Sequence, residues 1–112
     1  MKAPLIFAAA GLSATLLSAP VQAVDAAAAE ALAKKEGCLK CHAVDKKKDA
    51  ISLKDIAKKH AGKADGEAKI LAQITTGQKV KLEDGTEEEH KTVKSKDQAA
   101  VSNLIQWILS IK

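Results

Sequence analysis

The chain has 112 residues, of which 46% are hydrophobic and 29% charged, and its formal net charge is +4. This length allows one small domain with a thin core, and such domains usually need a further cross-link for stability. The positive charge comes from lysine alone, and aromatic residues make up only 2% of the chain. The composition therefore argues against a nucleic-acid-binding protein, which would show a stronger basic stripe and aromatic platforms for bases.

The first 23 residues are expected to form a secretory signal peptide. Lys2 gives a positive start, and an Ala- and Leu-rich stretch over residues 3–17 leads to small residues at the cleavage site. A membrane anchor would need about 20 apolar residues, and serines interrupt this stretch earlier. The sequence therefore predicts a removed signal over residues 1–23 and an exported domain over residues 24–112, with no stable membrane insertion.

The first helix of the mature domain is expected over residues 26–35. Asp25 can accept a hydrogen bond from the free amide groups at its start, and its Ala-rich run has a high helix propensity. Gly37 suits the left-handed position after its end. The helix therefore leads directly into a pair of cysteines.

Two further helices are expected before residue 78. Ser52 is suited to cap one of them, with Asp55 at the capping-box position, and Gly62 is suited to end it. The next is predicted over residues 65–76 and ends at Gly77. Apolar residues recur at helical spacing in both, which predicts one buried face for each helix.

Residues 78–94 are predicted to form a long loop with a turn at Asp84-Gly85, because they contain few apolar residues and an acidic cluster. The last helix is expected to begin at Ser95, with Gln98 three positions later as in a capping box. Its apolar residues recur at helical spacing to the C-terminus: Val101, Leu104, Ile105, Ile108 and Ile111. No strand pattern competes with these elements.

The predicted fold is therefore an all-α domain of about four helices. Its core is poor in large side chains, since Trp107 is the only aromatic residue after the signal peptide. A large flat group could fill the resulting gap.

The residues Cys38-Leu39-Lys40-Cys41-His42 match the pattern for covalent attachment of haem. The two thiols add to the two vinyl groups of haem, and the two residues between them set the separation of the thioether bonds. The His directly after the second Cys is then held beneath the iron as its proximal ligand. The motif predicts one haem c per chain, bound through Cys38, Cys41 and His42, and its attachment outside the cytoplasm agrees with the predicted signal.

Three other interpretations of the cysteines are weaker. A redox-active pair of the thioredoxin type accompanies a βαβ pattern, which this sequence does not show. A disulfide between the two cysteines would close a very short loop and stabilise little. Zinc could bind them together with His42, His60 or His90, but zinc motifs usually end in a second closely spaced pair, and His60 and His90 are 30 positions apart.

The sequence around the motif, from Lys34 to Lys47, resembles the opening of small bacterial class I cytochromes c. Residues 53–62 (LKDIAKKHAG) are similar to the helix that follows the haem motif in that family, and residues 105–110 (IQWILS) are similar to its terminal helix. The resemblance implies the small class I cytochrome c fold, in which the N- and C-terminal helices cross. It also implies that the haem is buried with its thioether edge near the surface.

The sequence departs from this family at two positions that act on the haem iron. The family's usual sixth ligand is a Met before the last helix, whereas the one Met of this chain is Met1, in the predicted signal. The family also has a Gly-Pro after the motif, whose carbonyl orients the proximal His. Here the corresponding stretch is residues 48–51 (KDAI), so another carbonyl is expected to accept the Nδ1 proton of His42.

His90 is the candidate sixth ligand, because it lies 17 positions before Trp107, nearly the separation at which the family places its Met. Bis-histidine ligation replaces the thioether that favours ferrous iron, so a low reduction potential is expected. The alternatives are that His90 is an ordinary solvated loop residue, that the sixth position is open, or that another side chain binds there: His60, Lys79, Lys81 or Lys91.

The expected function is that of a soluble periplasmic carrier of single electrons, not an enzyme, since the loop offers only His90 and neighbouring glutamates as a distal acid–base pair. The alternative is a haem protein that binds a small gas (NO, CO or O₂) at an open or labile sixth position. A cluster of lysines surrounds the motif and could steer a redox partner with an acidic docking surface: Lys34, Lys35, Lys40, Lys46, Lys47 and Lys48.

Overall fold

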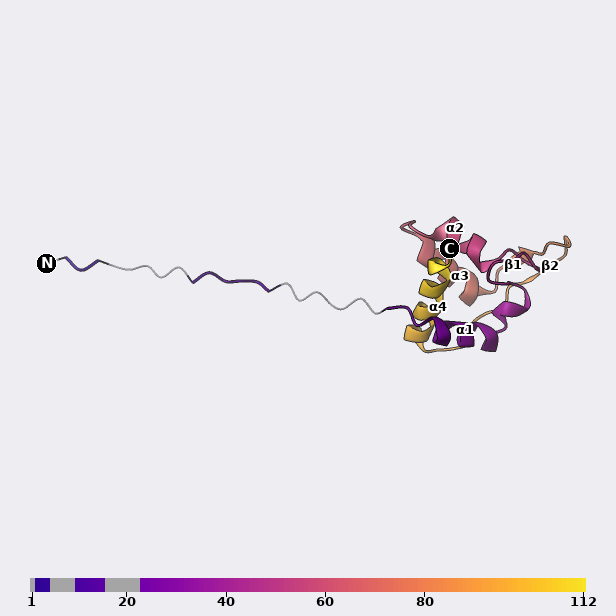
Figure 1. Ribbon diagram of the computed structural model, residues 1–112, viewed down its shortest axis with the longest axis horizontal. Coiled ribbons are helices and arrows are strands. Elements are labelled where there is room, and N and C mark those ends of the chain that lie inside the picture. Colours follow the sequence, from indigo (N-terminus) through magenta and orange to yellow (C-terminus); the bar gives the residue numbers. More distant parts are fainter. Residues whose placement is uncertain (1, 5–9, 16–22) are drawn as a thin grey trace.

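The computed structural model describes residues 2–4, 10–15 and 23–112 (Figure 1). Parts of the predicted signal peptide, residues 1, 5–9 and 16–22, lie outside the described residues. Within the described residues, no helix has the length and apolar character that crossing a membrane requires. The elements follow one another as helix α1 (Ala26–Lys35), the 3₁₀ turn η1 (Cys38–Lys40), helices α2 (Leu53–His60) and α3 (Gly66–Thr76), strands β1 (Lys79–Lys81) and β2 (Glu87–Glu89), and helix α4 (Gln98–Ser110).

Helices α1 and α4 form the most extensive contact between elements. Ala29 and Ala33 are fully buried on α1, and these small side chains let its backbone approach Leu104 of α4, which is also fully buried. A reciprocal pair of hydrogen bonds fixes where the helices meet, because Asn103 accepts from the amide of Asp25 at 2.9 Å and donates to its carbonyl at 2.8 Å. The crossing of terminal helices implied by the family resemblance is therefore present.

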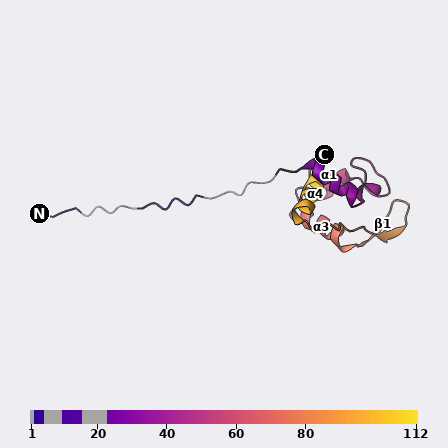
Figure 2. The same ribbon diagram turned by 90° about the horizontal axis from the view of Figure 1, so that it is seen from below.

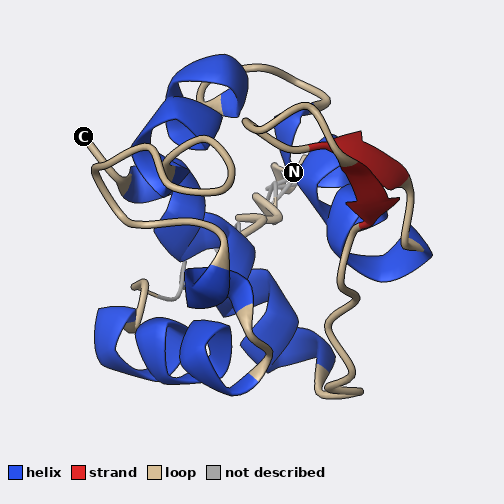
Figure 3. Cartoon of the chain, turned by 90° about the vertical axis from the view of Figure 1, so that its right-hand side faces the viewer, coloured by secondary structure: helices blue, strands red, loops and turns tan. Residues whose placement is uncertain are grey.

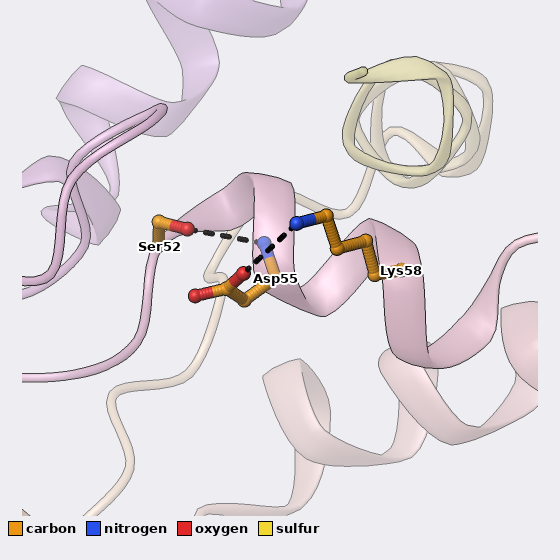
Figure 4. A network of polar contacts seen from close by, with 3 residues as sticks. All are labelled: Ser52, Asp55 and Lys58. Carbon is orange, nitrogen blue, oxygen red and sulfur yellow. Dashed lines mark hydrogen bonds and ion pairs between the residues drawn. The ribbon is translucent and has the colours of Figure 1, made fainter.

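Helix α2 begins as its sequence predicts. The hydroxyl of the buried Ser52 accepts a hydrogen bond from the amide of Asp55 at 3.0 Å (Figure 4), and this satisfies one of the free amides of the first turn. Lys58 lies 3.9 Å from the carboxylate of Asp55, but both side chains are exposed, so this ion pair adds little stability. The cap and the buried Leu53 therefore hold the helix against α4.

Helix α3 is closely packed at its start against the end of α2. A Cβ atom on the buried Gly66 would collide with the carbonyl oxygen of His60, so only glycine allows α3 to follow α2 this closely. Asp65 precedes the helix without capping it, and the hydrogen bond that Lys69 donates to its carboxylate lowers the pKa of Asp65. Gly77 ends the helix with a left-handed backbone (φ 64°), as predicted.

The prediction that residues 78–94 form a loop without strands is wrong. Strands β1 and β2 pair as an antiparallel hairpin, in which Lys79 faces Glu89 and Lys81 faces Glu87. Every residue of the two strands except Val80 is exposed, so the alternation of polar and apolar residues that normally indicates a strand is absent. Opposite charges on directly facing residues favour the pairing instead.

The turn predicted at Asp84-Gly85 is confirmed at the tip of the hairpin. Gly85 adopts a left-handed backbone (φ 87°), and the amide of Leu82 donates to the carbonyl of Thr86 at 2.8 Å. The carboxylate of Asp84 accepts from the amide and the hydroxyl of Thr86, and the hydroxyl bond is the main cause of a lowered pKa of Asp84. Figure 3 shows the two strands at one edge of the helical domain.

Helix α4 begins later than predicted. Its cap is Asp97, whose carboxylate accepts from the amide of Ala100 at 3.1 Å, whereas the hydroxyl of Ser95 accepts from Asp97 outside the helix. Aspartate and serine cap helices equally well, and the helix follows the later of the two residues. The prediction of a predominantly helical domain with four helices is confirmed.

Candidate functional site

A cavity of about 700 Å³ occupies the middle of the domain. In Figure 2, α1 lies on one side of the domain and α3 with β1 on the other. The cavity walls are mainly aliphatic and come from α2, α3, α4 and residues 78–94, which we call the distal segment: Leu53, Ile56, Ile70, Ile74, Val80, Leu82, Val93 and Ile108. A cavity of this size with a largely apolar surface is typical of a cofactor site. Charged side chains also line this cavity: Glu36, Lys59, Lys69, Lys81, Glu83, Glu88, Glu89 and Lys91.

The cysteine motif forms one wall of this cavity as a single compact turn. Gly37 takes a left-handed backbone (φ 79°) directly after α1, so the chain reverses and η1 begins. The amide of Lys40 then donates to Gly37 at 3.2 Å, and the amide of His42 donates to Cys38 at 3.1 Å. Cys38, Cys41 and His42 are therefore brought together, and all three line the cavity.

Both cysteines are half-buried free thiols, as addition to vinyl groups would require. Burial raises the pKa of Cys38, so its thiol form is favoured in the protein. Among the described residues, no group of three or more His, Cys, Asp or Glu side chains is placed to hold a metal ion.

The ring of His42 is oriented by a backbone carbonyl. Its Nδ1 lies 2.6 Å from the carbonyl oxygen of Ile51, and an oxygen of this kind can only accept, so Nδ1 donates and Nε2 keeps its lone pair. Ile51 belongs to the stretch that stands in place of the family's Gly-Pro. Burial lowers the pKa of His42, which favours the neutral imidazole that a metal ligand must be.

His90 lies at the end of β2 and lines the cavity. Its amide donates to Gln78 at 2.9 Å, which extends the hairpin by one rung, and its Nδ1 lies 2.8 Å from the carbonyl oxygen of Lys91. As in His42, the carbonyl occupies Nδ1 and leaves Nε2 free. The centres of the two imidazole rings are 6.2 Å apart, and the ring planes are tilted by 42°.

This separation fits a metal ion held between the two rings. A metal–imidazole bond is about 2.1 Å long. The centre of a five-membered ring lies about 1.1 Å from its atoms when its bonds are about 1.35 Å long. Two ligands on opposite sides of one ion therefore have ring centres about 6.4 Å apart, close to the separation of His42 and His90. The residues present thus fit an iron with two axial histidines.

The other candidate ligands are placed differently. His60 is half-buried on α2, and it lines the cavity together with Lys81 and Lys91, whereas Lys79 is not among the lining residues. The lysines at these positions are exposed to solvent, and a lysine binds a metal only through a deprotonated amine. His60 and His90 both line the cavity, and the ring centre of His90 lies 6.2 Å from that of His42.

Two features of the site could not be read from the sequence. The carbonyl of Ile51 belongs to the backbone, so no side-chain type indicates it. The carboxylate of Glu36 accepts a hydrogen bond from the amide of Lys94 at 2.8 Å, and these residues are 58 positions apart. Such a long-range contact leaves no local pattern.

Comparisons with known proteins show the family and the fold of this chain. A family model described as Cytochrome c matches residues 26–112. The crystal structure of the class 1 cytochrome MtoD from Sideroxydans lithotrophicus ES-1 is 51% identical with a TM-score of 0.76, over 80% of this chain and 98% of that one. Cytochrome c552 of Nitrosomonas europaea is 31% identical with a TM-score of 0.57, over 74% and 99%. Cytochrome c2 of Rhodocyclus tenuis is 35% identical over 83 residues, which are 73% of this chain and 90% of that protein.

Proposed function

Because the chain belongs to the cytochrome c family, whose members bind one covalent haem c and carry single electrons, we propose that it is a periplasmic carrier whose haem iron has His42 and His90 as axial ligands. The observation that carries this proposal is the separation of the two imidazole rings, whose centres lie 6.2 Å apart at the wall of one cavity. When bound, the haem supplies an iron that exchanges one electron between its ferric and ferrous states.

The residues of this chain have separate roles in the proposal. Cys38 and Cys41 hold the haem through thioether bonds, and the carbonyl of Ile51 orients the ring of His42. The aliphatic side chains of the cavity wall would pack against the haem. Since an imidazole replaces the thioether that favours ferrous iron, the reduction potential is low for the family.

The proposal includes export through a cleaved signal over residues 1–23. The family match begins at residue 26, just after the expected cleavage site, and so leaves the signal outside the family domain. The mature protein then moves as a soluble carrier between its partners. Determination of the N-terminal sequence of the periplasmic protein tests this part, because the proposal requires it to begin at Val24.

The proposed partners are redox proteins with an acidic docking surface. The six lysines around the motif are all exposed, at the side of the domain where the thioether edge of the haem would lie: Lys34, Lys35, Lys40, Lys46, Lys47 and Lys48. Some of them already pair within the chain, such as Lys47 with Glu83 at 3.0 Å. The other lysines leave a positive surface that would raise the association rate with an acidic partner. Added salt would screen this attraction and lower the rate.

Replacement of His90 tests the axial ligation. In the wild-type ferric protein we expect a low-spin electron paramagnetic resonance spectrum with two nitrogen ligands and no sulfur-to-iron band in the near infrared. His90→Ala removes the distal imidazole and should make the haem high-spin, and added imidazole should restore the low-spin signal. His60→Ala is the matched control and should leave the spectrum unchanged. A low-spin His90→Ala protein, or a high-spin His60→Ala protein, would contradict the assignment.

The alternative, a gas-binding haem protein, differs in how readily the sixth position opens. In an electron carrier His90 stays on the iron, and its backbone bonds to Gln78 and its place in the hairpin support this. Carbon monoxide added to the ferrous protein at neutral pH separates the two functions. A carrier should react slowly, at a rate limited by the departure of His90, whereas an open position would react at once.

A further inference from the structure

The distal segment, residues 78–94, carries His90 and is attached to the rest of the domain at a small number of polar contacts. On the α3 side, the amide of Val93 donates to the carbonyl of Ile74 at 2.8 Å. On the opposite side, the hairpin tip reaches the loop after the motif, where the amide of Glu83 donates to the carbonyl of Asp49 at 3.0 Å. These contacts hold the two sides of the cavity at a set distance from each other.

Glu36 provides a further contact at the end of the distal segment. It is the C-cap of α1, where its amide donates to Leu32, and it directly precedes Gly37 and the motif. Its carboxylate accepts from the amide of Lys94 at 2.8 Å. One residue therefore links the start of the proximal motif to the chain four positions after the candidate sixth ligand.

We propose that Glu36 is a positioning residue for the sixth ligand: its carboxylate fastens the distal segment to the end of α1 and so keeps His90 opposite His42. This inference rests on the proposed function, because it concerns how firmly His90 is held on the iron. When the distal segment moves away from the cavity, the bond between Glu36 and Lys94 breaks. Loss of the bond therefore raises the population of the open form, in which the sixth position is free.

The size of the effect follows from the setting of the bond. Glu36 is half-buried and Lys94 is exposed, so water replaces part of the lost interaction when the bond breaks. A net hydrogen bond of this kind corresponds to a roughly three- to tenfold change in an equilibrium constant. Carbon monoxide can bind ferrous iron only after His90 leaves, so its rate of binding should rise by the same factor.

Three substitutions separate the hydrogen bond from the charge. Glu36→Ala removes both, Glu36→Asp keeps the charge but shortens the reach, and Glu36→Gln keeps the reach and an acceptor oxygen without the charge. Glu30→Ala is the matched control, because Glu30 is an exposed glutamate on the same helix whose partner is Lys34. Each haem-loaded protein is compared at equal haem content by the rate of carbon monoxide binding, the ferric high-spin fraction and the thermal unfolding midpoint.

We expect carbon monoxide to bind roughly three- to tenfold faster to Glu36→Ala and Glu36→Asp, with a larger high-spin fraction. Glu36→Gln and Glu30→Ala should stay within about twofold of the wild type, since both keep the bond to Lys94. If Glu36→Ala does not fold, the difference in carbon monoxide binding rate between Glu36→Asp and Glu36→Gln still tests the inference. A merely structural role would lower the unfolding midpoint and leave the binding rate unchanged, which overturns the inference.

Further outcomes also count against it. A wild-type rate in Glu36→Asp, or a Gln variant that behaves like Ala, would assign the effect to charge and overturn the inference. If His90→Ala speeds carbon monoxide binding but the Glu36 variants do not, the inference fails and the axial ligation stands. If the wild-type protein binds carbon monoxide at once and His90→Ala changes nothing, both the proposed function and the inference fail.

Discussion

Both imidazoles are held by backbone atoms, at the scale of single residues. Nδ1 of His42 lies 2.6 Å from the carbonyl oxygen of Ile51, and Nδ1 of His90 lies 2.8 Å from that of Lys91. The side chains of Ile51 and Lys91 are not part of these bonds. Their substitution should therefore preserve the ring orientations as long as the backbone keeps its path, and this explains how the domain can orient the ring of His42 without the family's Gly-Pro.

The identity of the residue at position 90 should set the reduction potential. His90→Met replaces an imidazole by a thioether, which stabilises ferrous iron, so the potential should rise by roughly 100 mV or more. A spectroelectrochemical titration measures this, and a new sulfur-to-iron band confirms that the Met is bound. His60→Met, on the cavity wall, is the control and should not shift the potential comparably. An unchanged potential with a bound Met would contradict the assignment of low potential to the ligand pair.

Acid should affect the ligation by His42 only at low pH. Burial lowers the pKa of His42 and the bond to Ile51 opposes this only in part, so the neutral, metal-binding form persists below about pH 6.5, where a free imidazole takes up its proton. The His90→Ala protein isolates this ligand. Its ferric absorption spectrum should stay constant as the pH falls from 7 through 6.5, where a free imidazole takes up its proton. A spectral transition with a midpoint near pH 6.5 would show that His42 is not protected.

At the scale of elements, the hairpin of β1 and β2 is the least predictable part of the fold. It presents a ladder of facing charges, Lys79 with Glu89 and Lys81 with Glu87, and buries almost no apolar surface of its own. Two-stranded hairpins are marginal alone, so this one depends on its contacts with the domain. Since His90 follows β2 directly, the order of the hairpin and the order of the proposed sixth ligand are coupled.

Reversal of one charge should therefore loosen His90. Glu87→Lys places two positive charges opposite each other at Lys81, which costs about 0.2–1 kcal/mol and should speed hydrogen exchange of the His90 amide roughly two- to fivefold. The combined change Glu87→Lys with Lys81→Glu restores opposite charges and should return exchange close to the wild-type rate. If the combined variant exchanges as fast as the single one, the cross-strand pair does not support the hairpin.

The elements that the sequence predicts well are those with local signals. Asp25 and Ser52 cap helices, and Gly37 and Gly77 end them, because capping depends on residues within one turn. The start of α4 was predicted two residues early for the cap, at Ser95 in place of Asp97, since both residue types suit that role. The strands were not predicted because the feature that favours them is the pairing of opposite charges between residues on two strands. That pairing is visible only when the register of the strands is known.

At the scale of the whole molecule, charge is distributed unevenly around the cavity. Exposed lysines surround the motif, and the acidic residues Glu87–Glu89 lie on β2. One of the lysines around the motif, Lys47, forms an ion pair with Glu83, which precedes the tip of the hairpin; their charged atoms are 3.0 Å apart. A charged reagent that approaches the motif therefore meets a mainly positive surface, while one that approaches the hairpin meets a mixed one.

Small redox reagents of opposite charge should reveal this field. An anionic complex such as hexacyanoferrate should react faster with the haem at low salt than at high salt, where the attraction to the lysines is screened. Lys40→Glu, inside the motif, should lower that rate several-fold, while Lys112→Glu at the C-terminus serves as the matched control. Equal effects of both substitutions, or no dependence on salt, would show that the lysine cluster does not steer reagents.

The part of the site that depends on the spacing of residues in the sequence could be predicted. Cys38, Cys41 and His42 are adjacent in the sequence, and His90 could be proposed from its distance to Trp107. The other features of the site are long-range contacts. The separation of the two imidazole rings and the hydrogen bond from Lys94 to Glu36 both depend on how α3 and the distal segment pack against the rest of the domain. Contacts of this kind follow from the packing of the whole domain, so no local pattern specifies them.

The hairpin also has a consequence for self-association. Within the described chain its two strands pair only with each other, so each has an edge with free backbone groups that could add a strand from a second molecule. Lysine or glutamate occupies every strand position except Val80, and a third strand would have to bury those charges. A carrier that must collide briefly and repeatedly with its partners is thereby protected from aggregation at its only sheet among the described residues.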